Sequence, residues 1–167
     1  RQGDIEFGDL KLPFACVATN IITGQEVIIN QGSVLEGVRA SISVPIIFTV
    51  ARLKGRYLVD GGLVNPVPVS VLKDMGADFV IAVTLTPRLS EASKQVYLEE
   101  LEPEESDPVK EPNIFTIAMK LIDIYGSHLV GSCLSGADVI IEPRMAGIGL
   151  GDFGRAEECI LEGGLST

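Results

Sequence analysis

The sequence predicts an α/β fold in which a central, mostly parallel sheet is flanked by helices. Short apolar runs that suit strands alternate with segments of helical periodicity along the 167 residues. The run Phe79 to Leu85, FVIAVTL, is apolar and rich in β-branched residues, which is typical of a central parallel strand. The segment before it begins at Pro68 and ends at Gly76 with helix start and stop signals. A helix that enters a parallel strand indicates an αβ unit with right-handed connectivity.

Two hairpins and a helix are predicted in the first 60 residues. Leu12 to Thr19 and Ile21 to Ile29 form the first hairpin through a Thr23-Gly24 turn. A helix begins after Ser33, with Glu36 completing a capping box, and ends before Pro45. The second hairpin joins Phe48–Ala51 to Arg56–Val59 around Lys54-Gly55.

The C-terminal half returns to helical and strand patterns after an acidic stretch. Residues 88–112 include seven carboxylates, three prolines and one lysine in EELEPEESDPVKEP, which predicts a solvated surface loop. A mobile flap near an active site is the alternative interpretation. Ile114 to Leu134 has helical periodicity, Asp138 to Glu142 suits a last strand, and Ala156 to Glu162 suits a closing helix.

Composition indicates one globular domain and excludes several functions. The chain is 46% hydrophobic and 22% charged, and no uninterrupted apolar run reaches the roughly 18 residues of a membrane span. The net charge of −10 argues against nucleic acid and against long-range attraction to an anionic bilayer. Any peripheral membrane contact is therefore expected to be apolar and local.

The cysteines and the glycine-rich segment indicate neither a metal nor a cofactor. Cys16, Cys133 and Cys159 lack paired spacing for zinc and lie in apolar patterns, so we expect reduced core residues in a cytoplasmic compartment. The segment GIGLG, residues 147–151, lacks the spacing of a dinucleotide loop.

A carboxylate stands between a strand and two glycines in residues 55–68, GRYLVDGGLVNPVP. The apolar run Tyr57-Leu58-Val59 ends at Asp60, and Gly61 and Gly62 follow at once. A carboxylate held rigidly at the edge of a core suits a catalytic base. Because Asp-Gly is a common turn dipeptide, simple capping of a tight turn is the alternative. The glycines permit a positive φ or a close backbone approach, and both readings can be true.

Residues 37–48, GVRASISVPIIF, precede this segment, and together the two resemble the patatin-like phospholipase family. Members of that family carry A-S-x-x-x-P-x-x-F, then a hairpin, then D-G-G before a proline-rich helix start. The matching positions here are Ala40, Ser41, Pro45, Phe48, Asp60, Gly61, Gly62, Asn65, Pro66 and Pro68. Residues 7–28 and 152–164 are also similar to family segments, so the resemblance covers nearly the whole chain.

The resemblance implies hydrolysis of a phospholipid or related ester lipid by a Ser–Asp dyad. Asp60 would be the catalytic base, with Gly61 and Gly62 as supporting motif positions. The family's serine lies in a G-x-S-x-G elbow, and a glycine-rich loop forms its oxyanion hole. The sequence shows neither, because the nearest approach to an elbow, residues 131–136, has the wrong spacing and follows a helical pattern.

Both elements precede, in the family, the point at which this chain begins. We therefore expect the C-terminal part of a single patatin-like domain that lacks its N-terminal elements and is inactive alone. An N-terminal segment, in cis or as a separate chain, would supply the serine. The alternative is a non-catalytic α/β interaction module that has lost its nucleophile.

Five other polar residues have modest expected roles. His128 lies in the middle of a helical pattern and is expected to be a structural or exposed residue. Ser41 and Ser43 lack an elbow and suit capping or packing, whereas Arg39 could pair with a carboxylate or with a lipid phosphate. Asn20 stands where the family often has Asp, which affects a local turn and not the dyad.

Overall fold

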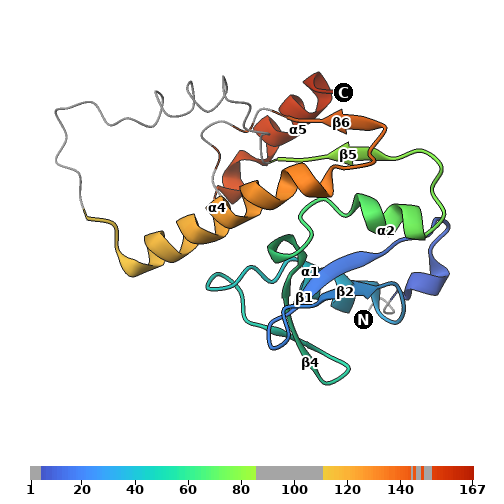
Figure 1. Ribbon diagram of the computed structural model, residues 1–167, viewed down its shortest axis with the longest axis horizontal. Helices are drawn as coiled ribbons and strands as arrows, with labels where there is room; N and C mark the ends of the chain where they lie inside the picture. Colours follow the sequence, from blue (N-terminus) through green and yellow to red (C-terminus); the bar gives the residue numbers. More distant parts are fainter. Residues whose placement is uncertain (1–4, 86–110, 144, 146–147, 149–151) are drawn as a thin grey trace.

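The computed structural model describes residues 5–85, 111–143, 145, 148 and 152–167. Nearly all of the expected acidic loop at 88–112 and most of the GIGLG segment lie outside these residues. The described residues form an α/β structure with two separate sheets (Figure 1).

The larger sheet is built from the two expected hairpins. Its strands are β1 (Cys16–Asn20), β2 (Glu26–Ile29), β3 (Ala51–Leu53) and β4 (Arg56–Asp60). The order is β2-β1-β4-β3, and every neighbouring pair is antiparallel. The two hairpins are thus joined through their inner strands, β1 and β4.

Short turns explain why these strands are antiparallel. In the first turn Gly24 has a φ of 71°, and Asn20 Oδ1 accepts hydrogen bonds from the amides of Ile22 at 3.0 Å and Thr23 at 3.4 Å. In the second turn Lys54 and Gly55 both have positive φ, at 48° and 75°, which suits a two-residue hairpin loop. Both predicted hairpins are present, but the first strand of the second hairpin lies at Ala51–Leu53 and not at Phe48–Ala51.

Helix α1 (Val34–Ser41) covers one face of the larger sheet. The Ser33 hydroxyl accepts a hydrogen bond from the Glu36 amide at 3.3 Å, as the predicted N-terminal cap requires. The short 3₁₀ helix η1 (Phe7–Asp9) adds an aromatic ring to the same core. The buried residues of this core are Phe7, Cys16, Ala18, Ile29, Ala40 and Leu58.

A second core lies around the smaller sheet, which pairs β5 (Ile81–Val83) with β6 (Val139–Ile141) in parallel. Helix α2 (Val69–Asp74) precedes β5 in the chain. Gly76 follows the end of this helix and has a φ of 94°. The long helix α4 (Ile114–Cys133) precedes β6, and η3 (Phe153–Arg155) and α5 (Ala156–Leu165) close the chain. The buried residues of this core are Val67, Val69, Val80, Ala82, Val130 and Leu134.

The expected central, mostly parallel sheet is therefore not the main sheet of the described residues. The larger sheet is antiparallel because its strands come from hairpins, and the parallel pairing is limited to β5 and β6. The expected burial of β5 on both faces is also incorrect. Val80, Ala82 and Thr84 are buried, whereas Ile81 and Val83 are each 55% exposed.

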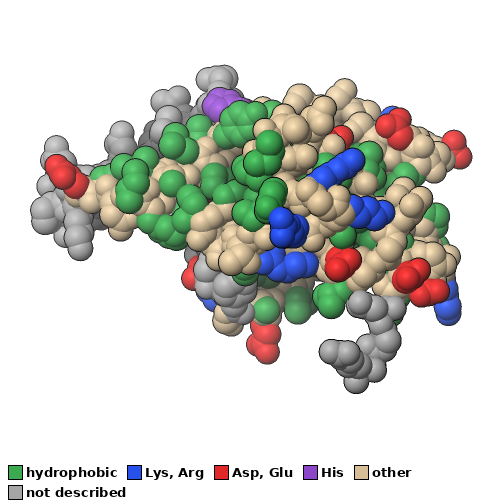
Figure 2. Space-filling view, turned by 90° about the horizontal axis from the view of Figure 1, so that it is seen from below, with side chains coloured by type: hydrophobic (Ala, Val, Ile, Leu, Met, Phe, Trp, Pro, Cys, Tyr) green, Lys and Arg blue, Asp and Glu red, His purple; other side chains and the backbone are tan. Residues whose placement is uncertain are grey.

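Helix α4 is long and apolar, but little of it is buried. Only its C-terminal turns reach the second core, and Figure 1 shows its N-terminal part projecting from the body. Hydrophobic side chains gather at that end of the molecule in Figure 2. By length and composition the helix could cross a membrane, a test that core helices of soluble proteins also pass. Its exposed apolar residues include Ile114, Phe115, Ile117, Leu121, Ile124 and Tyr125.

One glycine permits a close approach of β1 to the turn after β4. A Cβ atom on Gly61 would lie 2.3 Å from the carbonyl oxygen of Val17, in a strand with neighbours on both sides. We expect Gly61→Ala to lower the free energy of unfolding by about 1–3 kcal/mol, the usual cost of forcing extra atoms into a packed site. Urea denaturation of the wild type and the variant measures this difference.

Gly8→Ala is the matched control, because a Cβ atom there meets nothing within 4 Å. That variant should stay within about 0.5 kcal/mol of the wild type. Equal stability changes in the two variants would contradict the close approach.

Candidate active site

The backbone of Asp60 is held from three sides at the end of β4. Asp60 pairs with Ala18 of β1 in the antiparallel ladder. Its amide donates a hydrogen bond to the Ser43 carbonyl at 3.0 Å, and its carbonyl accepts one from the Thr19 hydroxyl at 2.8 Å. The position from which the carboxylate projects is therefore well defined by its neighbours.

The Asp60 carboxylate caps the turn that follows it. Oδ1 accepts a hydrogen bond from the Gly62 amide at 2.7 Å and so caps the 3₁₀ helix η2 (Gly61–Leu63). Turn capping is thus part of what Asp60 does. Among the parts of the chain that the structure describes, no donor contacts the second carboxylate oxygen, Oδ2. One oxygen is fixed by the turn, and the other is left for a further partner.

Burial changes the proton affinity of this group. Asp60 is half-buried, and desolvation raises the pKa of its carboxyl group above the usual Asp value, while the Gly62 hydrogen bond opposes this rise. A raised pKa makes a carboxylate a better proton acceptor. The local structure therefore raises the pKa of Asp60, which is the change that a general base needs.

Asp60 is one of the residues that line a hollow of about 460 Å³ between β1, α1 and the turn after β4. Apolar side chains predominate around it, as is usual for small-molecule sites. The lining residues are Phe14, Ala15, Cys16, Val17, Val38, Ser41, Ile42, Asp60, Gly61, Gly62, Asn65, Pro66 and Pro68. Burial raises the pKa of the Cys16 thiol, so this thiol is a weak nucleophile.

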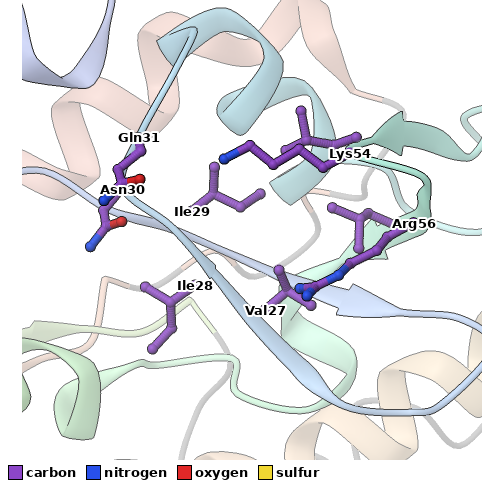
Figure 3. A pocket seen from close by; sticks show the side chains of 9 residues that line it. Val27, Ile28, Ile29, Asn30, Gln31, Lys54 and Arg56 are labelled. Carbon is purple, nitrogen blue, oxygen red and sulfur yellow. The ribbon is translucent and has the colours of Figure 1, made fainter.

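A second hollow, of about 300 Å³, has a different chemistry. Figure 3 shows Lys54 and Arg56 reaching from the β3–β4 hairpin toward Ile29 and Val27 of β2. None of its described lining residues carries a carboxylate or a hydroxyl group. It therefore lacks both the carboxylate and the hydroxyl that a Ser–Asp dyad needs.

The structure separates the roles of the two nearby serines. Ser41 lines the Asp60 hollow at the end of α1. Ser43 is fully buried, and its hydroxyl donates to the Arg39 carbonyl at 2.6 Å, which agrees with the expected packing role. Among the described residues Arg39 contacts Ser43, Thr49 and the Phe48 ring, and none of these partners is a carboxylate.

The remaining candidates lie away from this arrangement. His128 is exposed on α4 and belongs to neither hollow. Gly131 and Ser132 lie within α4, so residues 131–136 have no strand before them and do not form an elbow. The residues that the structure describes contain no cluster of His, Cys, Asp or Glu suited to a metal ion.

The sequence did not predict the two groups distant in the chain that form hydrogen bonds with the backbone of Asp60. The Thr19 hydroxyl and the Ser43 carbonyl are 41 and 17 residues away in the chain. No local pattern encodes such contacts. The only available signal was the position of Thr19 at the end of a strand that pairs with the Asp60 strand.

Comparison with known proteins agrees with this local architecture. Residues 3–73, which include Asp60 and both hairpins, match the family model of the patatin-like phospholipases. An uncharacterized NTE family protein of Mycobacterium bovis is 34% identical over 83 residues, or 50% of this chain and 23% of that protein. A second such protein, of Mycobacterium tuberculosis, is 42% identical over 59 residues, or 35% of this chain and 10% of its own length.

A lysophospholipase of Aspergillus fumigatus is 33% identical over 95 residues, which is 57% of this chain and 6% of that enzyme. The chain thus spans less than a quarter of the length of these relatives. The motif order, the Asp60 turn and these matches agree with one another, and they support the patatin-like phospholipase family for residues 3–73.

Proposed function

We propose that this chain supplies the general base of a lipid acyl hydrolase, and that Asp60 is that base. The observation that carries the proposal is a half-buried aspartate that is fixed through one carboxylate oxygen and that lines a mainly apolar hollow. In the reaction, the hydroxyl of a serine attacks the ester carbonyl of the lipid. The proton of that hydroxyl passes to Asp60 and later to the leaving alcohol.

The serine is proposed to come from a segment outside the 167 residues, in cis or as a separate chain. Two serines, Ser41 and Ser43, lie near Asp60, and neither suits the task. Ser43 is buried and bonded to Arg39, and Ser41 is the last residue of α1 and not part of a turn from a strand into a helix. The same segment would bring the oxyanion-hole donors.

The proposed substrate is a phospholipid or a related ester lipid. The lysophospholipase of Aspergillus fumigatus and the family match support this class. The apolar lining of the hollow suits an acyl chain. A cytoplasmic location with peripheral contact to membranes is part of the same proposal, since such substrates are found there. The competing proposal is a module without catalytic function, and the following experiments separate the two.

The kinetic prediction concerns Asp60→Asn in the full-length gene product that contains these residues. Asn keeps the shape of the side chain and an oxygen for the Gly62 amide, but it lacks the basic oxygen. We expect kcat on phospholipid vesicles and on a short-chain ester to fall by about 10²–10⁴-fold, the usual effect of losing a general base. KM should change far less, because the base acts on the serine proton.

His128→Ala is the control for this experiment. His128 is exposed on α4 and has no proton to carry in the proposed reaction, so turnover should stay within about threefold of the wild type. Near-normal turnover of Asp60→Asn, or a dead His128→Ala variant, would refute the Ser–Asp mechanism.

A second prediction applies to the 167-residue chain by itself. If the serine lies outside it, a fluorophosphonate probe should form no stoichiometric adduct, and ester hydrolysis should not exceed the buffer rate. Intact-protein mass spectrometry detects the adduct. A stoichiometric adduct on any serine of this chain would place the nucleophile inside it and overturn the proposed division of the site.

A third prediction follows from the raised pKa of Asp60. The folded state binds this proton more tightly than the unfolded state. This difference in proton binding stabilises the folded state. The stabilisation is complete below the ordinary Asp pKa of about 3.9, and it is lost as the pH rises through the higher pKa of Asp60 in the folded protein. At pH 7 the wild type therefore carries the cost of a half-buried charge, and Asp60→Asn does not.

Asp60→Asn should accordingly raise Tm at pH 7, and its advantage should shrink as pH falls toward 4. Thermal unfolding followed by circular dichroism at several pH values measures both effects. A lower Tm at pH 7, or a difference that grows on acidification, would contradict the desolvation of Asp60.

A further inference from the structure

The loop that joins α1 to β3 holds an unusual backbone conformation. Ile46 has a φ of 75°, which is rare for a β-branched residue and costs free energy. The side chains of Ile46, Ile47 and Phe48 are 54%, 37% and 40% exposed, so little apolar burial offsets this cost. Such a conformation persists only where other contacts determine it.

Arg39 of α1 supplies those contacts at both ends of the loop. Its Nη1 donates to the Ser43 hydroxyl, and its Nη2 donates to the carbonyl and the hydroxyl of Thr49, both at 2.9 Å. The guanidinium also lies over the Phe48 ring, 5.8 Å from its centroid. One planar group therefore ties Ser43 to Thr49 across the loop.

Ser43, at the N-terminal end of this loop, also contacts Asp60. The Ser43 carbonyl accepts the hydrogen bond of the Asp60 amide at 3.0 Å, and the Ser43 side chain is fully buried. A shift of Ser43 would therefore move the strand end that carries the carboxylate. Next to Ser43, Ile42 lines the same hollow as Asp60.

We propose that Arg39 is a positioning residue for Asp60, acting through Ser43. It does not touch substrate in this role. The guanidinium holds Ser43, and the Ser43 carbonyl sets the direction of the backbone from which the carboxylate projects. This inference rests on the proposed function, because positioning matters only if Asp60 acts on a serine.

Lysine cannot replace arginine in this arrangement. The fork of the guanidinium reaches two partners on opposite sides of the loop at once, whereas the ammonium group of Lys is a single point. Arg39→Lys keeps the charge and most of the apolar stem, so it removes the fork with little other change.

Amide hydrogen exchange of the 167-residue chain tests the contact without requiring activity. In Arg39→Lys the Asp60 amide should exchange about tenfold faster or more, because its acceptor is no longer fixed. The Asn20 amide, which donates to Gln25 at 2.9 Å in the other hairpin, should keep its rate. Unchanged exchange at Asp60, or equal acceleration at Asn20, would overturn the proposal.

Arg52→Lys is the matched control. Arg52, on β3, also makes a cation–π contact and a hydrogen bond to a hydroxyl group. Its guanidinium lies 5.1 Å from the Tyr57 ring centroid, and its Nη2 lies 2.9 Å from the Tyr57 hydroxyl oxygen. It does not bond Ser43 or Thr49. Its replacement should leave exchange at Asp60 unchanged, and an effect equal to that of Arg39→Lys would overturn the specific role of Arg39.

Activity of the full-length gene product completes the test. Arg39→Lys should lower kcat by about 10–100-fold with KM within about twofold, as expected for a misplaced catalytic group. If Asp60→Asn is inactive and Arg39→Lys has normal kcat, the positioning role is wrong and the proposed function stands. If Asp60→Asn is fully active, the proposed function fails and the role of Arg39 fails with it.

Discussion

The pairing of β4 with β1 is the constraint on which the rest of the site depends. It ends at Ala18 and Asp60, and immediately beyond it Gly61 passes so close to the Val17 carbonyl that no side chain fits between them. This contact sets where the chain leaves the sheet. The turn, its cap at Gly62 and the direction of the carboxylate all follow from that exit point.

The same arrangement lowers the stability of the folded protein, because it keeps the charged Asp60 carboxylate partly out of water. A half-buried carboxylate that has no cationic partner among the described residues is less stable in its charged form than it would be in water, as its raised pKa indicates. The Gly62 amide offsets only part of this cost. The left-handed conformation of Ile46 adds local strain in the loop between α1 and β3. Arg39 bonds to residues on both sides of Ile46, Ser43 and Thr49. Backbone strain and perturbed pKa values both occur often at functional sites.

Sequence patterns predicted the local parts of this structure and failed on the non-local parts. The turns at Gly24 and at Lys54-Gly55, the Ser33 cap and the strand end at Asp60 were all predictable, because each depends on residues a few positions apart. Arg39 was not assigned, because its partner Thr49 is ten residues away across an irregular loop. The resemblance identified Asp60, but the residues themselves left turn capping open as the alternative.

The incorrect prediction for the sheet has a different physical origin. Apolar composition reports that a strand prefers burial, but it does not report which element covers it or which strand pairs with it. FVIAVTL has the composition of a strand covered on both faces, yet within the described residues only the face of Val80, Ala82 and Thr84 is covered. The hairpins, in contrast, specify their own partners, because a short loop between consecutive strands favours antiparallel pairing. Short-range connectivity therefore predicts pairing reliably, whereas hydrophobicity predicts only the need for a partner.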